Sequence, residues 1–170
     1  FLRLAWDVEG TRARPIDDVV AQWADENIAP GQGARIAPLF AAYHRLNFAR
    51  RPEHLQWYLP GEKARPSPLD IAQADARLAE FARLEAATDA LTPSIPAARQ
   101  DAFFELLAYP VHASAAANRR VFAAEAHDRL RDTDLAGATA RGRMAWAADA
   151  QLRALTRRYN RDLAGGKWRG

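Results

Sequence analysis

Apolar residues recur at three- and four-residue intervals along most of the chain, which is the spacing of one face of an α-helix. The clearest of these faces runs from Ile71 through Phe81 and Leu84 to Leu91, over roughly six turns. Shorter faces of the same kind predict helices between Pro15 and Ala29, from about Gly33 to Phe48, and from Leu135 to about Arg161. Val and Ile are scarce beside Ala, which favours helices over a sheet.

The central stretch of the chain is Phe103–Asn118, with the sequence FFELLAYPVHASAAAN. It predicts a helix from about Ala97 to Leu130. The small residues after Pro110 would allow a neighbouring helix to approach closely, so we expect this helix at the centre of a bundle. Pro110 has no N–H and its ring clashes with the preceding turn, so we expect a bend of more than ~20° there.

The segment from Arg50 to Pro68 has no helical period. Four prolines (Pro52, Pro60, Pro66 and Pro68) and Gly61 predict a long surface connection, with one helical turn expected at Glu53–Trp57. The next helix is expected to begin near Leu69, with Ser67 or Asp70 as its cap. The sequence therefore predicts an all-α fold: one helical domain over residues 1–170, a bundle of about five helices, mostly antiparallel, with a proline-kinked central helix.

Charge and composition narrow the classes of function. The chain of 170 residues has a net charge of +3, and its arginines alternate with Asp and Glu, as in Asp128–Asp132. Nucleic-acid modules instead gather basic residues on one face, so we expect no nucleic-acid partner. No apolar run approaches the length of a membrane span, and we expect no membrane partner. The absence of Cys excludes disulfides and thiolate metal sites.

The residues that could carry chemistry show no catalytic spacing. The four histidines include no HExxH pair, so we expect no metal and no cofactor. The carboxylates of Glu80, Glu85, Asp101 and Glu105 fall on polar helix faces and are interpreted as solvated charges or as intrahelical partners of arginines. No catalytic residue is assigned.

Ser114 and Asn118 lie one turn apart among alanines on the central helix. Two interpretations stay open: the pair faces water, or it is buried and forms a structural polar clamp between helices. Burial would require partners, because an unsatisfied buried polar group costs about 1–3 kcal/mol.

Five segments occur in an order that resembles a known family. They read FLRLAWDVEG, AQWADENIAP, ARIAPLFAAYHRLNFARRPEHL, DAFFELLAYPVHASAAANRR and RYNRDLAGGKW. Together they resemble the helical domain of glycoside hydrolase family 115, the xylan α-glucuronidases. The match rests mainly on Tyr109-Pro110-Val111, Asn118, Tyr159-Asn160 and Ala164–Trp168. It covers most of the chain and is weakest across Gln56–Pro68.

The resemblance implies that the chain is a non-catalytic structural domain of a larger multidomain enzyme. The parent would be an inverting glycosidase that removes (4-O-methyl)glucuronic acid from xylan, bacterial and periplasmic or secreted. Its catalytic residues would lie in a barrel-like domain preceding this one, and a β-sandwich domain would follow. The alternative is a stand-alone helical protein-interaction module without enzymatic activity.

Large apolar side chains outside the periodic faces are the expected interdomain contacts. They form three groups: Phe1, Leu2, Leu4 and Trp6; Trp57, Tyr58 and Leu59; and Trp168. A competing interpretation makes Trp57 and Tyr58 a platform on which sugars stack.

Overall fold

The computed structural model describes residues 5–50, 55 and 67–169, and of Thr11 only the backbone. The predicted all-α class is confirmed: the described residues form helices and no strand. The helices are α2 (Val8–Arg12), α3 (Ile16–Asn27), α4 (Gly33–Ala49), α6 (Ile71–Asp89), α7 (Gln100–Phe103), α8 (Tyr109–Leu130) and α9 (Leu135–Arg161). Short 3₁₀ turns lie at Thr92–Ser94, Ala97–Arg99 and Leu163–Gly165.

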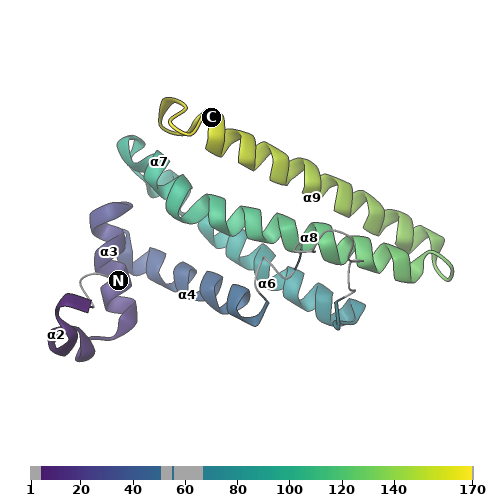
Figure 1. Cartoon of the computed structure of the whole chain (residues 1–170), viewed down its shortest axis with the longest axis horizontal. Helices are drawn as coiled ribbons and strands as arrows, with labels where there is room; N and C mark the ends of the chain where they lie inside the picture. The colour runs from purple at the N-terminus through teal and green to yellow at the C-terminus, as the bar shows by residue number, and fades with distance from the viewer. Residues whose placement is uncertain (1–4, 51–54, 56–66, 170) are drawn as a thin grey trace.

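The long helix α8 lies at the centre of the arrangement (Figure 1). It packs along α9 on one side and against α6 on the other, and α4 in turn contacts α6. A tight turn joins α8 to α9, so these two helices run antiparallel. At one end α3 packs on α4, and the short helix α2, which the sequence analysis did not predict, lies beyond it.

Side-chain caps set the start of two long helices. Asp70 Oδ1 accepts the Gln73 backbone N–H, and the Gln73 side chain accepts the Asp70 N–H, which forms a capping box for α6. Of the two caps considered for this helix, Asp70 is therefore the one used. Asp134 caps α9 in the same manner by accepting the Gly137 N–H at 2.9 Å.

The chain passes Pro110 without a loop. Phe104–Ala108 form a π-helical turn between α7 and α8, and the Tyr109 N–H bonds to the Phe104 carbonyl, five residues back. Pro110 is then the second residue of α8, where a missing N–H is tolerated. The sequence predicts the interruption at Pro110 but not the π turn, and the angle of the bend stays a prediction.

The core follows most of the predicted apolar faces, but Ile16 and Leu135, at the start of the faces predicted for α3 and α9, are exposed. Phe81, Phe122 and Val111 are almost completely buried, and so are Ala115 and Ala116 on α8. Small side chains at these α8 positions let the neighbouring helices approach closely, as the sequence analysis expected. Of the predicted surface connection, only Arg50, Leu55, Ser67 and Pro68 are described, and none of the three at its ends is helical. Leu55, within the turn expected at Glu53–Trp57, is helical and buried, and the rest of that turn lies outside the described residues.

Candidate functional site

Arg77 on α6 is bonded to two other helices. Its Nε donates to Asn118 Oδ1 on α8 at 2.8 Å, while Nη1 and Nη2 donate to the carbonyls of Leu46 and Arg50 at 3.0 and 3.2 Å. The Asn118 Nδ2 donates to the Ser114 carbonyl at 2.8 Å. Both Ser114 and Asn118 are buried. Asn118 thus takes part in an inter-helix clamp, to which Ser114 contributes its main-chain oxygen.

The two carbonyls bound by Arg77 belong to the end of α4, where the last turn of a helix leaves acceptors without an intrahelical donor. A guanidinium satisfies them and complements the negative end of the helix dipole. Burial, and the nearby charge of Arg50, lower the pKa of Arg77 below its ordinary value. The clamp therefore fixes the end of α4 against α6 and α8.

A second polar cluster joins α6, α8 and α9. His112 Nδ1 lies 3.2 Å from Glu85 Oε1, and its Nε2 lies 3.0 Å from Asp89 Oδ1. Arg119 forms an ion pair with the other Glu85 oxygen and donates to Gln151 Oε1 at 2.9 Å. The interpretation of Glu85 as a solvated or intrahelical charge is wrong: this carboxylate is buried and bridges two residues of α8.

The cluster shifts two pKa values in opposite directions. The hydrogen bond to Glu85, followed by the charges of Asp89 and Glu85, raises the pKa of His112 above 6.5 although burial opposes this. Burial alone would raise the pKa of Glu85, but the bond from His112 and the charge of Arg119 outweigh it and lower the pKa below 4.5. The folded state therefore favours an imidazolium beside a carboxylate.

The other three carboxylates have different partners. Glu80 pairs with Arg83 one turn away on α6, as predicted. Asp101 accepts the Ala164 backbone N–H at 3.1 Å, and the Tyr159 hydroxyl donates to Glu105 at 3.4 Å. Asp101 and Glu105 thus contact the end of α9 and the turn after it, which their positions on polar faces did not reveal.

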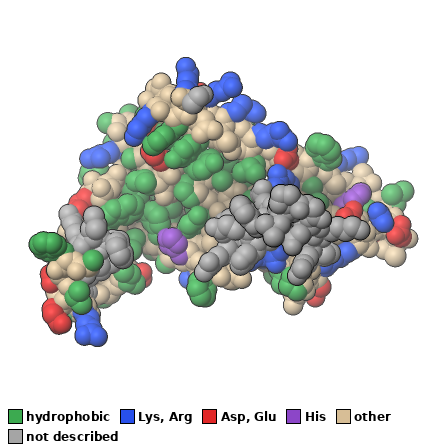
Figure 2. Space-filling model, viewed as in Figure 1, with side chains coloured by type: hydrophobic (Ala, Val, Ile, Leu, Met, Phe, Trp, Pro, Cys, Tyr) green, Lys and Arg blue, Asp and Glu red, His purple; other side chains and the backbone are tan. Residues whose placement is uncertain are grey.

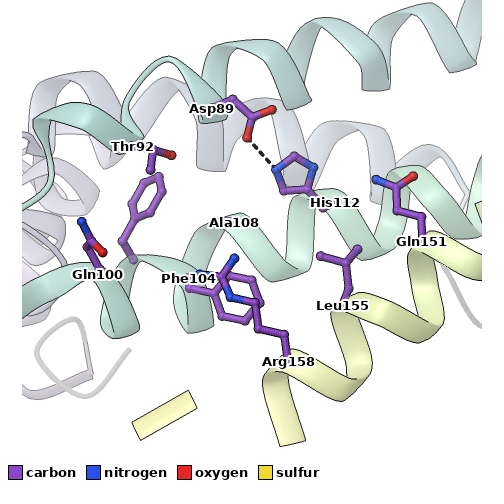
Figure 3. A pocket seen from close by; sticks show the side chains of 10 residues that line it. Asp89, Thr92, Gln100, Phe104, Ala108, His112, Gln151, Leu155 and Arg158 are labelled. Atoms are coloured by element: carbon purple, nitrogen blue, oxygen red, sulfur yellow. Dashed lines mark hydrogen bonds and ion pairs between the residues drawn. The ribbon is translucent and has the colours of Figure 1, made fainter. Parts of the chain in front are cut away.

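A pocket of ≈ 350 Å³ opens beside the His112 cluster (Figure 3). Its lining comes from the end of α6, the following turn, α7, the π turn, α8 and α9: Asp89, Thr92, Gln100, Phe103, Phe104, Ala108, His112, Gln151, Leu155 and Arg158. The guanidinium of Arg158 lies over the ring of Phe104, with Cζ 3.8 Å from its centroid. The lining is therefore partly aromatic and partly polar.

On the face shown in Figure 2, hydrophobic side chains gather over the start of the central helix, between α9 and α4. The half-buried apolar side chains that pack against the core come from the same elements: Leu39, Phe40, Tyr43 and Leu46 of α4, Leu106 and Tyr109 of the central helix, and Leu155 and Tyr159 of α9. This set is called the apolar face below.

Of the expected interdomain contacts, only Trp6 and Trp168 are described, and Phe1, Leu2, Leu4, Trp57, Tyr58 and Leu59 lie outside the described residues. Trp6 is 94% exposed and Trp168 is 43% exposed. The Trp168 ring is stacked on Tyr159, with centroids 6.4 Å apart, so it also packs on its own chain.

Two further aromatic side chains, Phe48 and Trp146, are strongly exposed and were missed. Both fall outside the periodic apolar faces of their helices, a signal that was available in the sequence.

Within the described part of the chain, no group of three or more acidic or histidine side chains is placed to hold a metal, and no helix there is long and apolar enough to cross a membrane. No family model and no curated protein matches the sequence.

Proposed function

We propose that this chain is a non-catalytic structural domain of a glycoside hydrolase family 115-like enzyme that removes (4-O-methyl)glucuronic acid from xylan. Catalysis would take place in a barrel-like domain that precedes it, and a β-sandwich domain would follow. In this proposal the helical domain carries no catalytic residue and holds its neighbours in place.

The observation that carries the proposal is how the buried polar side chains are used. Arg77 and Asn118 bond across three helices, and Glu85, His112 and Arg119 bond across α6 and α8. Groups of these types do chemistry when they converge on a cleft that substrate can enter. Here they are bonded to one another, and of these five residues only His112 also lines the pocket. Such bonding is typical of residues that fix the relative position of helices.

The half-buried side chains of the apolar face support a role in docking. A contiguous patch of apolar side chains on one face commonly marks an interaction site. The apolar face, together with Trp6 near one end of the chain and Trp168 near the other, would provide contacts for the neighbouring domains.

The direct test is to assay release of glucuronic acid from glucuronoxylan by the 170-residue chain and by its parent protein. We expect turnover by the parent and none above a blank by the chain alone. Turnover by the purified chain would contradict a purely structural role.

A pair of matched variants tests docking. Trp6→Ser should lower the melting temperature of the parent but leave that of the isolated chain unchanged, since its ring contacts little of this chain. Trp146→Ser, an equally drastic change at another exposed tryptophan, should affect neither protein. Equal effects of Trp6→Ser on parent and chain would show that no neighbour covers this residue.

The second candidate is a stand-alone helical interaction module, which the exposure of Phe48 and Trp146 favours. The flanking coding sequence separates the two: a large upstream domain supports the enzyme, and a nearby start codon supports the module. For the sugar platform at Trp57 and Tyr58, the test is binding of xylo-oligosaccharides that Trp57→Ala abolishes.

A further inference from the structure

The pocket beside His112 has charged and polar groups that the helix-to-helix contacts do not use. Arg158 is held in place by its contact with the Phe104 ring, yet within the described residues it has no hydrogen bond or ion pair through its guanidinium. Figure 3 shows the guanidinium directed into the pocket rather than away from it. An oriented arginine of this kind offers paired donors that match a carboxylate.

Asp89 provides the opposite charge on another side of the pocket (Figure 3). The hydrogen bond from His112 reaches its Oδ1, and in the described part of the chain Oδ2 is not used. The other ring nitrogen of His112 is bonded to Glu85, which holds the imidazole in place. The imidazole in turn fixes the direction of the Asp89 carboxylate. Asp89 can therefore accept a hydrogen bond from a hydroxyl or an ammonium group.

The surface between the two charges suits a short carbon skeleton. Phe103, Phe104, Ala108 and Leu155 form the apolar part of the lining. Around them lie the Thr92 hydroxyl, the Gln100 amide and the Gln151 amide, of which only Gln151 Oε1 bonds to another side chain of the described residues. The volume of ≈ 350 Å³ lies at the lower end of the range for small-molecule sites.

The backbone conformation around the pocket also supports a binding site. Phe104 and Ala108, the first and last residues of the π turn, both line it. Single π turns inside α-helices occur frequently at functional sites, because the extra residue per turn changes the direction of side chains. Phe104, the first residue of this turn, is the one whose ring lies beneath Arg158.

From this geometry we propose that the pocket binds a small organic carboxylate that also carries a hydrogen-bond donor, with the carboxylate on Arg158 and the donor on Asp89. This site lies within the chain itself and does not depend on the parent enzyme. The expected ligand is a short hydroxy or amino acid whose carbon skeleton rests on Phe104 and Leu155.

The probes are unbranched ω-amino carboxylates from glycine to 6-aminohexanoate, together with gluconate, measured by saturation-transfer NMR and calorimetry on the full 170-residue chain. We expect affinity to peak at one chain length, since the two charged groups are fixed in the protein. The primary amide of the best probe, which lacks the carboxylate, should bind at least about tenfold more weakly, as loss of a charged hydrogen bond predicts.

Matched variants assign the two ends of the ligand. Arg158→Gln should weaken the best probe at least about tenfold, and Arg158→Lys should restore part of the affinity. Arg157→Gln, at the adjacent exposed arginine outside the pocket, should have no effect. Asp89→Asn should weaken the amino carboxylate but not the simple carboxylate of the same length.

Both variants at position 158 change an exposed side chain, and their melting temperatures show directly whether they fold. The proposal is overturned if none of the probes binds, if affinity is unaffected by Arg158→Gln, or if Arg157→Gln reduces it equally.

Discussion

Arg77 Nε and Asn118 Oδ1, which are 41 residues apart in the sequence, are 2.8 Å apart in the fold. This bond connects α6 to α8, and the same guanidinium binds the carbonyl oxygens at the end of α4. One arginine side chain therefore connects three helices. Its hydrogen bonds within the described residues all go to neutral acceptors.

Replacing Asn118 with Ala should lower the free energy of unfolding by about 1–3 kcal/mol, because Arg77 Nε loses its acceptor in a buried position. The measurement is denaturant unfolding at neutral pH. Asn160→Ala on the exposed side of α9 is the control and should stay within about 0.5 kcal/mol of the wild type. If both variants unfold alike, the clamp does not contribute to stability.

Stability should depend on pH through His112. Its pKa is raised by folding, so the stabilisation it provides is complete below its ordinary value of 6.5 and is lost as pH rises through the folded value. The pKa of Glu85 is lowered, so its contribution is present above 4.5 and is lost as pH falls through the folded value. The cluster should therefore stabilise most between about 4.5 and 6.5.

Unfolding measured against pH for the wild type and His112→Gln tests this dependence. The difference in free energy between the two proteins should shrink as pH rises above 6.5. Asp89→Asn should lower the pKa of His112, as followed by NMR of the imidazole, since it removes one of the charges that raise it. A constant difference across this range would show that the cluster is not coupled to folding.

Gly33 should not tolerate a methyl group. A Cβ at this position would lie 2.0 Å from the carbonyl oxygen of Ala21, where α3 approaches the start of α4. Gly33→Ala must then move backbone, at a cost of about 1–3 kcal/mol or more. The loss should appear as a lower midpoint in chemical denaturation.

Gly142 in α9 is the matched control for Gly33. A Cβ there meets nothing closer than His127 Nδ1 at 3.4 Å, so Gly142→Ala should stabilise by up to about 1 kcal/mol through helix propensity. Opposite signs for the two substitutions are expected. Stabilisation by both would mean that α3 and α4 are less closely packed than the structure shows.

Replacing Pro110 with Ala should alter packing more than helix content. The new N–H can bond to the Leu106 carbonyl in the α register, which competes with the π turn. Far-UV circular dichroism should stay within a few per cent of the wild type, while the near-UV signal, to which Tyr109 and Phe104 contribute, should change. A large loss of far-UV signal would indicate that Pro110 is needed to form the helix itself.

The sequence by itself determined the all-α class and the approximate extent of the long helices. These follow from local rules: the apolar period selects the helix, Asp70 and Asp134 supply side-chain caps, and Pro110 marks an interruption. Each signal lies within a few residues of the feature that it predicts, so no tertiary contact is needed to read it.

The tertiary structure alone decided which polar residues meet. Glu85 and Glu80 both lie on α6, yet Glu85 is buried against His112 and Arg119 while Glu80 pairs locally with Arg83. The pocket likewise brings Asp89 close to residues of α9 such as Arg158, far away in the sequence. Such contacts depend on how the packed helices are rotated and at what angle they cross. Side chains throughout the core set this geometry together, so no local sequence pattern contains it.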